Sequence, residues 1–392
     1  MTNPIKTILQ IIPSLHSGGV ERGVIDTAIE LKKQNFNSIV ASSGGAMVSQ
    51  LDSLQIQHIQ INLKTKNPLK IYRNIKKIND VIVKHKIDLI HVRSRAPMIS
   101  AYFACKKNIN IKLVSTIHGP YSVNLGGNRI LSKVKTYYNS FMLKSDAIIT
   151  VSNFIKEYVL KNYQSLFEES LKNKITVIPR GVDIKTFDPD SISISRTVNL
   201  TQKWNIPEDK KIILFPARIT SWKGHEFLID SLKKVKNDYF CIFIGSDHGH
   251  EAFCKKIKQK ITDSNLGEKV KFLDNQKDMA VTYSVANIVI SASIKPEAFG
   301  RVAIESQAMK KITIATNIGG SLETIIDGKT GFLVKNKDTD DFAAKIDLAL
   351  SLSNEDTKKI GEAARENIIS NFTNQKMLDS TIEIYKKLLR LS

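Results

Sequence analysis

Short runs of β-branched and apolar residues alternate with helical patterns along this chain, in two successive series. Because strands that alternate with helices pair in parallel and are covered on both faces, each series predicts a doubly wound, Rossmann-like α/β domain. Ligands of such sheets bind at the carboxyl ends of the strands. The expected strands are 6–15, 38–41, 89–92, 113–117, 147–151 and 175–178 in the first series, and 212–215, 240–244, 270–273, 288–291, 312–315 and 332–334 in the second.

The alternation is lost between Asp188 and Pro207, where two prolines and a Ser-Ile repeat occur. A chain of 392 residues is also too long for one ordinary domain. We therefore predict two domains that face one another across a ligand-binding cleft. The predicted parts are an N-terminal domain over 1–187, a linker over 188–207, a C-terminal domain over 208–370, and a final helix over 371–392 that can pack back onto the first domain.

The composition is that of a protein of the reducing cytoplasm. Its three cysteines, Cys105, Cys241 and Cys254, are scattered and form no C-x-x-C pair, so no disulfide framework is expected. The N-terminus runs into an apolar strand without the pattern of a signal peptide. No run of about 18 apolar residues occurs, so no membrane-spanning helix is expected.

Positive charge is concentrated in the N-terminal half. The net charge is +20, and residues 1–188 hold 27 Lys and Arg against 12 Asp and Glu, whereas the remainder holds 31 against 26. A basic surface attracts nucleic acid or an anionic leaflet, and a solvated charged face is the alternative. Aromatic residues are not concentrated in the basic stretches, so nucleic acid is not expected. Six basic residues surround a predicted helix over 68–83, namely Lys64, Lys66, Lys70, Arg73, Lys76 and Lys77.

Two cations follow the first strand of the second series. Arg218 and Lys223 lie between that strand and the next predicted helix, where ligands of an α/β sheet bind. A guanidinium fork and an ammonium group both suit phosphate oxygens. Solvated surface cations are the alternative, but the position at a strand end favours an anion site.

Two acids surround a predicted helix start further along the chain. Glu297 follows the strand over 288–291, and Glu305 lies one to two turns into the helix that Gly300 opens. A loop carboxylate can accept hydrogen bonds from sugar hydroxyls, and a carboxylate on the helix can accept two from a ribose diol. The amides near Gly300 can hold phosphate. The alternative is a pair of ordinary acids that the helix dipole favours.

Together these motifs resemble the retaining glycosyltransferases of GT-B fold, in the family usually numbered four. Glu297-x7-Glu305, with Phe299-Gly300 inside it, is similar to the signature of that family. Arg180 stands where the hinge motif of the family usually has asparagine. Further similarities, in family order, are Ser17-Gly18-Gly19-Val20-Glu21-Arg22, Thr116-Ile117-His118-Gly119, Pro179-Arg180-Gly181-Val182-Asp183, Arg218-x4-Lys223-Gly224, Gly319-Gly320-x2-Glu323 and Gly328-x2-Gly331-Phe332.

The resemblance implies roles for the matching residues. The catalytic set is His118, which holds the transferring sugar, Arg218 and Lys223, which stabilise the departing diphosphate, and Glu297, which binds sugar hydroxyls. No metal and no other cofactor is required in this family, and Asp338-Thr339-Asp340 is interpreted as a helix cap. The implied donor-binding set is Gly18, Gly19, Arg218, Lys223, Glu297, Phe299, Gly300, Arg301 and Glu305.

The N-terminal domain normally meets the acceptor in this architecture, while the C-terminal domain binds the nucleotide sugar. Residues 91–97 resemble a stretch in enzymes that build bacterial surface polysaccharide or lipopolysaccharide core. Arg93 and Arg95 of this stretch, with Tyr121, are the predicted acceptor-binding residues. The expected acceptor is a glycan or glycolipid at the cytoplasmic side of the membrane, where the basic domain is also able to contact anionic lipid.

The implied reaction is hexosyl transfer with retention by a front-face route. The leaving phosphate takes the acceptor proton while Arg218 and Lys223 spread its charge. Two alternatives stay open: a nucleotide-sugar epimerase of the same fold, and a non-catalytic protein that binds nucleotide sugar or nucleic acid. A dinucleotide-dependent dehydrogenase is not expected, because no G-x-G-x-x-G motif follows the first strand.

Overall fold

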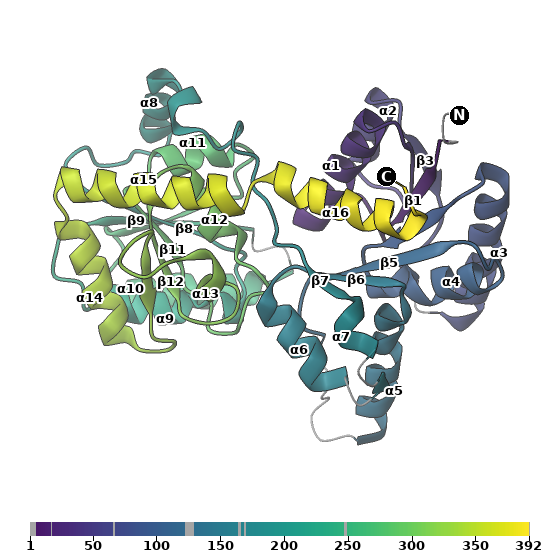
Figure 1. Ribbon diagram of the computed structural model, residues 1–392. Helices are drawn as coiled ribbons and strands as arrows, with labels where there is room; N and C mark the ends of the chain where they lie inside the picture. Colours follow the sequence, from purple (N-terminus) through teal and green to yellow (C-terminus); the bar gives the residue numbers. More distant parts are fainter. Residues whose placement is uncertain are drawn as a thin grey trace. The chain divides into compact units, whose positions relative to one another are not determined.

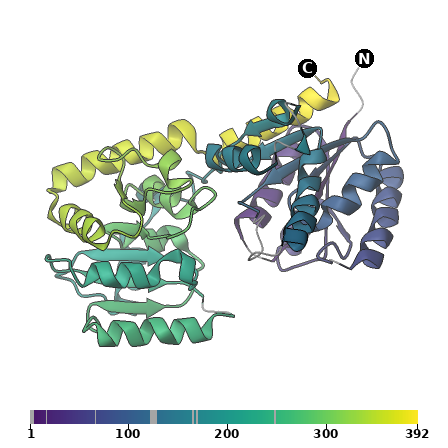
Figure 2. The same cartoon turned by 90° about the horizontal axis from the view of Figure 1, so that it is seen from below.

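The computed structural model describes residues 5–16, 18–65, 67–121, 129–163, 166–167, 170–246 and 249–391. Two residues of the sequence analysis, Ser17 and Lys66, lie outside these ranges. The chain forms two compact units (Figure 1). Unit 1 comprises Met1–Pro179 with Met377–Ser392, and unit 2 comprises Arg180–Lys376. Each unit is built on a parallel sheet with helices on both faces (Figure 2), which confirms the predicted α/β class.

Unit 1 contains a seven-stranded sheet in the order β3-β2-β1-β4-β5-β6-β7, all parallel. Its strands are β1 (Thr7–Ile11), β2 (Asn37–Ser42), β3 (Gln57–Gln60), β4 (Leu89–Val92), β5 (Lys112–Ile117), β6 (Ala147–Thr150) and β7 (Ile175–Val177). Its helices are α1 (Gly19–Lys33), α2 (Val48–Ser53), α3 (Pro68–His85), α4 (Arg95–Lys106), α5 (Arg129–Ser140), the 3-10 helix η1 (Phe141–Lys144), α6 (Asn153–Tyr163), α7 (Ser170–Lys174) and most of α16 (Asn374–Leu389).

Helix α16 returns from unit 2 to complete the core of unit 1. Its Met377, Ile382 and Tyr385 pack in one apolar cluster with Ile8 of β1 and Leu89 of β4. The period of these apolar residues is helical, and each is buried. The C-terminal helix therefore stabilises a sheet whose strands lie about two hundred residues or more earlier in the sequence.

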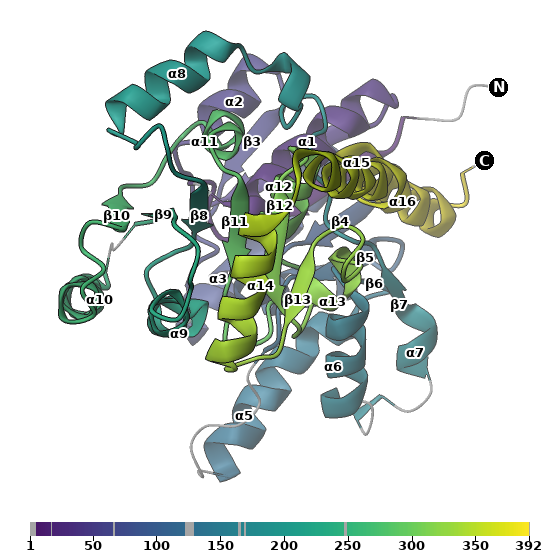
Figure 3. The same cartoon turned by 90° about the vertical axis from the view of Figure 1, so that its left-hand side faces the viewer.

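Unit 2 contains a six-stranded parallel sheet in the order β10-β9-β8-β11-β12-β13, which Figure 3 shows. Its strands are β8 (Ile212–Pro216), β9 (Phe240–Ile244), β10 (Val270–Leu273), β11 (Ile288–Ser291), β12 (Ile312–Thr316) and β13 (Phe332–Val334). Its helices are η3 (Pro189–Ser191), α8 (Ile194–Lys203), η4 (Ser221–Lys223), α9 (His225–Leu232), α10 (Glu251–Asp263), α11 (Met279–Ser284), α12 (Arg301–Ala308), α13 (Ser321–Thr324), α14 (Thr339–Ser351) and α15 (Asn354–Asn371).

The segment 188–207, predicted as a linker, is part of unit 2 instead. Trp204, at the end of α8, is buried in the apolar cluster on one face of the unit 2 sheet. Arg365 of α15 holds the start of the segment, because it donates hydrogen bonds to the carbonyl of Phe187 at 2.8 Å and to Asp188 at 2.9 Å. The units divide between Pro179 and Arg180, eight residues before the predicted linker begins.

The remaining expectations from composition concern cysteines and membrane spans. The three cysteines are buried thiols, as expected. Within the described ranges, no helix combines the length and the apolar character needed to cross a membrane.

Candidate functional site

The carboxyl ends of β8 and β11 meet at the centre of the unit 2 sheet. These two strands are neighbours where the strand order reverses, which is the position at which doubly wound sheets bind ligands. The turn after β8 carries Arg218 and Lys223, and the loop after β11 carries Glu297. Arg218 is exposed, whereas the side chains of Lys223 and Glu297 are only 14% and 15% exposed.

A glycine brings these two segments into contact. Gly224 has a φ of 82°, and a Cβ at this position would lie 1.8 Å from the carbonyl oxygen of Ala292, directly after β11. Only a residue without a Cβ fits so close an approach at positive φ. The backbone amide of Ile294 donates to the carbonyl of Trp222 at 2.9 Å, which fastens the two loops together.

Lys223 and Glu297 form an ion pair across this contact. The Nζ of Lys223 lies 2.7 Å from Oε1 of Glu297, and the hydroxyl of Ser293 donates to the same oxygen. The Lys223 ammonium also lies 4.5 Å from the ring centre of Trp222. Because both charged groups are mostly buried, the pair is held in one geometry rather than exchanging freely with solvent.

Glu305 is held on both of its carboxylate oxygens. Arg301, one turn earlier on α12, donates to Oε1 from Nε at 3.0 Å and from Nη2 at 2.7 Å. Tyr283 of α11 donates its hydroxyl to Oε2 at 3.1 Å. Tyr283 is fully buried, and burial together with the negative charge of Glu305 raises its pKa well above the ordinary value. The tyrosine is therefore a permanent donor to Glu305.

The turn that precedes α12 is shaped by packing. Gly300 adopts a left-handed conformation with φ of 88° and caps α12. Phe299, predicted to bind the donor, is instead 3% exposed and packs edge-on against Phe372 with ring centres 5.7 Å apart. The amide of Gly320 donates to the carbonyl of Glu297 at 3.0 Å. Phe299 thus anchors the loop in the core and presents only its backbone to the site.

In unit 1 the predicted residues also gather at carboxyl ends of strands. Gly18 caps α1, the helix that follows β1, and Gly19 is its first residue. His118 follows β5 directly and is half-buried. Arg95 begins α4 after β4. Since β1, β4 and β5 are neighbours in the sheet, these residues lie side by side at the carboxyl end of the strands.

Arg93, predicted to bind the acceptor, points into the interior of unit 1. Its residue is 5% exposed, and its Nη2 donates to Oε1 of Gln10 at 2.7 Å and to the hydroxyl of Thr27 at 2.9 Å. Both partners are neutral. The prediction is corrected on this point: the arginine ties β4 to β1 and α1, because the pleat after β4 turns its side chain toward α1.

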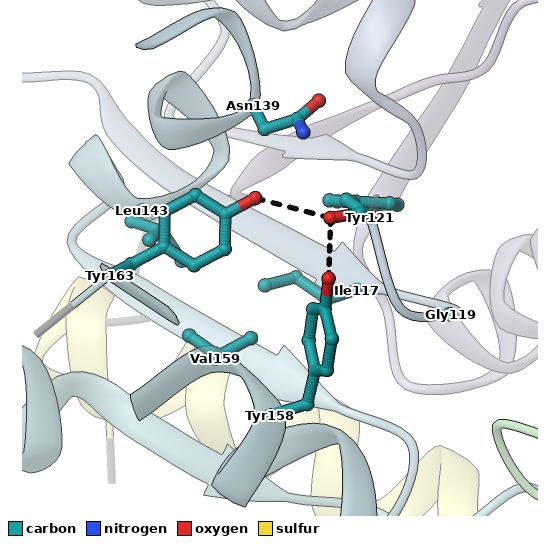
Figure 4. Close-up of a pocket in the computed structure, with 8 residues that line it drawn as sticks. All are labelled: Ile117, Gly119, Tyr121, Asn139, Leu143, Tyr158, Val159 and Tyr163. Carbon is teal, nitrogen blue, oxygen red and sulfur yellow. Dashed lines mark hydrogen bonds between the residues drawn. The ribbon is translucent and has the colours of Figure 1, made fainter. Parts of the chain in front are cut away.

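Arg95 and Tyr121, the other two predicted acceptor residues, lie together. The guanidinium of Arg95 stacks 4.3 Å from the ring centre of Tyr121 and donates to Asn139 at 3.0 Å. The hydroxyls of Tyr158 and Tyr163 both approach the Tyr121 carbonyl, at 2.6 Å and 3.4 Å (Figure 4). Tyr121 and its neighbours line a small recess, whose lining residues are Ile117, Gly119, Tyr121, Asn139, Leu143, Tyr158, Val159 and Tyr163.

Comparisons with known proteins show the family of this chain. The family described as Glycosyltransferase Family 4 matches residues 17–186, and that described as Glycosyl transferases group 1 matches residues 198–367. A crystal structure of a glycosyltransferase from Rickettsia africae is 43% identical, with a TM-score of 0.90 and full coverage of both chains. The chain belongs to glycosyltransferase family 4 and has the GT-B fold.

Two more distant relatives extend the comparison. The lipopolysaccharide 1,2-N-acetylglucosaminetransferase of Salmonella typhimurium is 23% identical to this glycosyltransferase over 382 residues, or 92% of each chain. The structure of Alr3699/HepE from Anabaena, a complex with UDP-glucose, is 22% identical with a TM-score of 0.81, covering 97% of this chain and 99% of that one. The likeness to the HepE structure extends over the whole fold.

Sequence reasoning missed several groups at the site of this glycosyltransferase. Tyr283 and Ser293 were not predicted, although they hold Glu305 and Glu297. His225, two residues after Lys223, is buried among Phe215, Phe243 and Phe253. Burial, with a smaller effect of Lys223, lowers the pKa of His225 to about 4. No family motif marks these residues, because their roles depend on neighbours that are distant in the sequence.

Proposed function

We propose that this glycosyltransferase moves a hexose from a nucleoside-diphosphate sugar to a glycan or glycolipid acceptor, with retention of configuration and without a metal ion. The observation that carries the proposal is the contact of Lys223 with Glu297 at the point where the unit 2 strand order reverses. The ion pair places a cation for the diphosphate next to a carboxylate for the sugar hydroxyls. The proposed reaction takes place on the cytoplasmic side of the bacterial membrane.

The ion pair suggests how the donor is received. In the structure Glu297 balances the charge of Lys223, so a mostly buried ammonium is never left without a partner. A donor diphosphate would take over Lys223, with Arg218 as the second cation, and release the Glu297 carboxylate toward the sugar. Fixed cations of this kind stabilise the charge that develops on the leaving group.

The ribose is assigned to Glu305. Its carboxylate retains lone pairs beyond the three hydrogen bonds from Arg301 and Tyr283. The nucleotide base is not specified by the site; the UDP-glucose of the HepE complex makes uridine the first base to test. The Salmonella relative likewise supports an acceptor of the lipopolysaccharide or surface-polysaccharide class.

The proposal is tested by donor binding followed by turnover. Melting temperature is measured with UDP, GDP and ADP, since a ligand that binds the native state raises it by mass action. With the sugar of the nucleotide that binds, release of nucleoside diphosphate is then followed with and without acceptor oligosaccharide, in the presence and absence of EDTA. The proposal expects acceptor-dependent release that EDTA leaves unchanged. Loss of turnover in EDTA, or conversion of the donor sugar to an epimer, would contradict it.

A further inference from the structure

Helix α5 of unit 1 has its amphipathic pattern inverted. Ile130, Val134 and Tyr137 share one face at helical spacing and are 75%, 61% and 60% exposed. The opposite face carries polar residues, and one of them, Asn139, is buried to 1% exposure. A surface helix normally packs its apolar stripe against the core and its polar side chains outward. The apolar face of α5 is therefore not used to hold unit 1 together.

An exposed aromatic ring on a neighbouring helix is linked to this apolar face through a buried ring. Phe103 of α4 is 43% exposed, and its ring lies 6.0 Å from that of Phe141 in η1, which is buried and lies 5.4 Å from the ring of Tyr137. The ammonium of Lys144 lies 4.2 Å from the ring centre of Phe141 and 5.2 Å from that of Tyr137. Aromatic rings mixed with lysine ammonium groups are typical of the boundary between lipid headgroups and acyl chains.

The charge of the N-terminal half is located in the same part of the chain. Residues 53–145 hold 17 Lys and Arg against two Asp, whereas residues 1–52 and 146–188 are each balanced. Within 89–145, which includes α4, α5 and η1, there are nine Lys and Arg and no acidic residue. The exposed apolar face thus belongs to a segment of strongly positive net charge.

We propose that this α5 surface, comprising Ile130, Val134, Tyr137, Phe103 and Lys144, docks the protein on an anionic lipid membrane. The apolar side chains would enter the boundary of the acyl chains while the surrounding lysines and arginines contact lipid phosphates. Figures 1 and 3 show α5 extending away from the sheet of unit 1, and the apolar side chains Ile130, Val134 and Tyr137 along it are each at least 60% exposed. The proposal concerns attachment and goes beyond the transfer reaction itself.

The other candidate occupant is a second copy of the chain. An interface between two copies through this face would bring two strongly basic chain segments together, and like charges at an interface disfavour association. Anionic lipid is complementary in charge and in its apolar layer. The geometry therefore favours the membrane over self-association.

Helix α3, around which the sequence placed the basic cluster, is organised differently. Its Ile78, Val81 and Ile82 are buried, so its apolar stripe faces the core in the ordinary way. Leu69, Tyr72 and Val83 are exposed by 71%, 73% and 65%. The exposed, charged Lys76 and Asp80 lie between Tyr72 and Val83 on the same side of the helix, so these residues do not form a continuous apolar face. The basic residues of α3 add to the positive potential without providing a surface that enters lipid.

The test measures co-sedimentation with vesicles of phosphatidylcholine alone and of phosphatidylcholine with phosphatidylglycerol, without donor or acceptor. Wild type is expected to bind the anionic vesicles. In the double variant Ile130→Ser/Val134→Ser, the partition coefficient is expected to fall about tenfold or more, because two exposed apolar side chains are removed from the lipid contact. Circular dichroism checks that the variant is folded. Nucleoside diphosphate release with a soluble acceptor is measured separately, so failure of docking is distinct from failure of the transferase assignment.

Two matched variants are compared with it. Leu348→Ser/Ile369→Ser removes apolar groups from unit 2 that are 44% and 43% exposed and is expected to bind like wild type. Leu69→Ser/Val83→Ser does the same on α3 and is also expected to bind. Wild-type binding by the α5 variant would overturn the proposal, as would loss confined to the α3 variant. A wild-type dimer in light scattering that becomes monomeric in the α5 variant, without vesicle binding, would assign the surface to a second copy instead.

Discussion

At the scale of single residues, the structure separates groups that meet the proposed donor from groups that hold them. Glu305 is the proposed ribose ligand, and Tyr283 donates to its Oε2 from a fully buried position. Since Tyr283 comes from α11 and Glu305 from α12, this hydrogen bond fixes the carboxylate across two helices. Tyr283 is thus a positioning residue, because it acts on the donor only through Glu305.

Replacement of this tyrosine tests that role. In Tyr283→Phe, the Glu305 carboxylate loses one donor and gains rotational freedom, so we expect the Kd for the nucleoside diphosphate to rise about tenfold. Calorimetric titration measures it. Tyr239→Phe is the matched control, because Tyr239 is equally buried in unit 2 and donates to the Leu232 carbonyl. Equal affinities for the two variants would show that Tyr283 has a structural role only.

The residue scale is also where the sequence was least informative. The position of Arg93 after a strand end was predicted correctly, but the direction of its side chain was not, because one residue of offset in an extended segment reverses the direction. Phe299 lies inside the signature motif, yet it is buried against Phe372, 73 positions later in the sequence. Motif spacing identifies a loop at the site, whereas burial within that loop depends on partners that the motif does not contain.

At the scale of elements, the turn from η4 to α9 decides whether the cation and the acid meet. This turn approaches the end of β11 so closely that a Cβ on Gly224 would overlap the Ala292 carbonyl. The ion pair between Lys223 and Glu297 depends on the same approach.

Replacement of this glycine is therefore expected to separate the two loops. In Gly224→Ala, the positive φ and the overlap together should lower the unfolding free energy of unit 2 by about 3 kcal/mol and reduce donor binding. Urea unfolding followed by circular dichroism measures the first effect. The control is Gly267→Ala, a position where an added Cβ meets no atom within 4 Å. An equally small effect of both substitutions would contradict the importance of the close approach.

Element type and order were largely predictable, as was the return of the final helix to unit 1, but the place of residues 188–207 was not. Strands and helices could be told apart in the sequence because their apolar residues recur with different periods. The buried strands β8 and β9 consist of apolar residues throughout. The segment 188–207 looked like a linker because of its prolines, yet Trp204 packs in unit 2. The outward apolar face of α5 was equally hidden, since a helical period does not state which side faces the core.

At the scale of the whole molecule, each unit contains a buried histidine that is neutral in the folded state. His91 of unit 1 is fully buried between Tyr385 and Thr116, and burial lowers its pKa well below the ordinary value. In unit 2, burial lowers the pKa of His225 to about 4. In the unfolded chain both histidines become protonated near pH 6.5. Between pH 6.5 and the lowered pKa of each folded-state histidine, the unfolded state therefore binds more protons than the folded state.

This difference predicts acid sensitivity. Stability is fully present above pH 6.5 and declines as the pH falls toward 4, by up to about 1.4 kcal/mol per pH unit for each histidine. The melting temperature is therefore expected to fall by several degrees between pH 7 and pH 5.5. His225→Phe, which suits the surrounding aromatic rings, should weaken the pH dependence of unit 2. An unchanged dependence in this variant would show that His225 does not cause it.

The measurement that tests the central claim most directly is turnover after removal of the Lys223 ammonium. Nucleoside diphosphate release is measured at saturating donor and acceptor for wild type, Lys223→Ala and the control Lys233→Ala, whose exposed lysine lies at the end of the adjacent helix. If Lys223 stabilises the departing diphosphate, kcat falls about a hundredfold or more in Lys223→Ala and is unchanged in the control. Wild-type turnover by a folded Lys223→Ala protein would contradict the account.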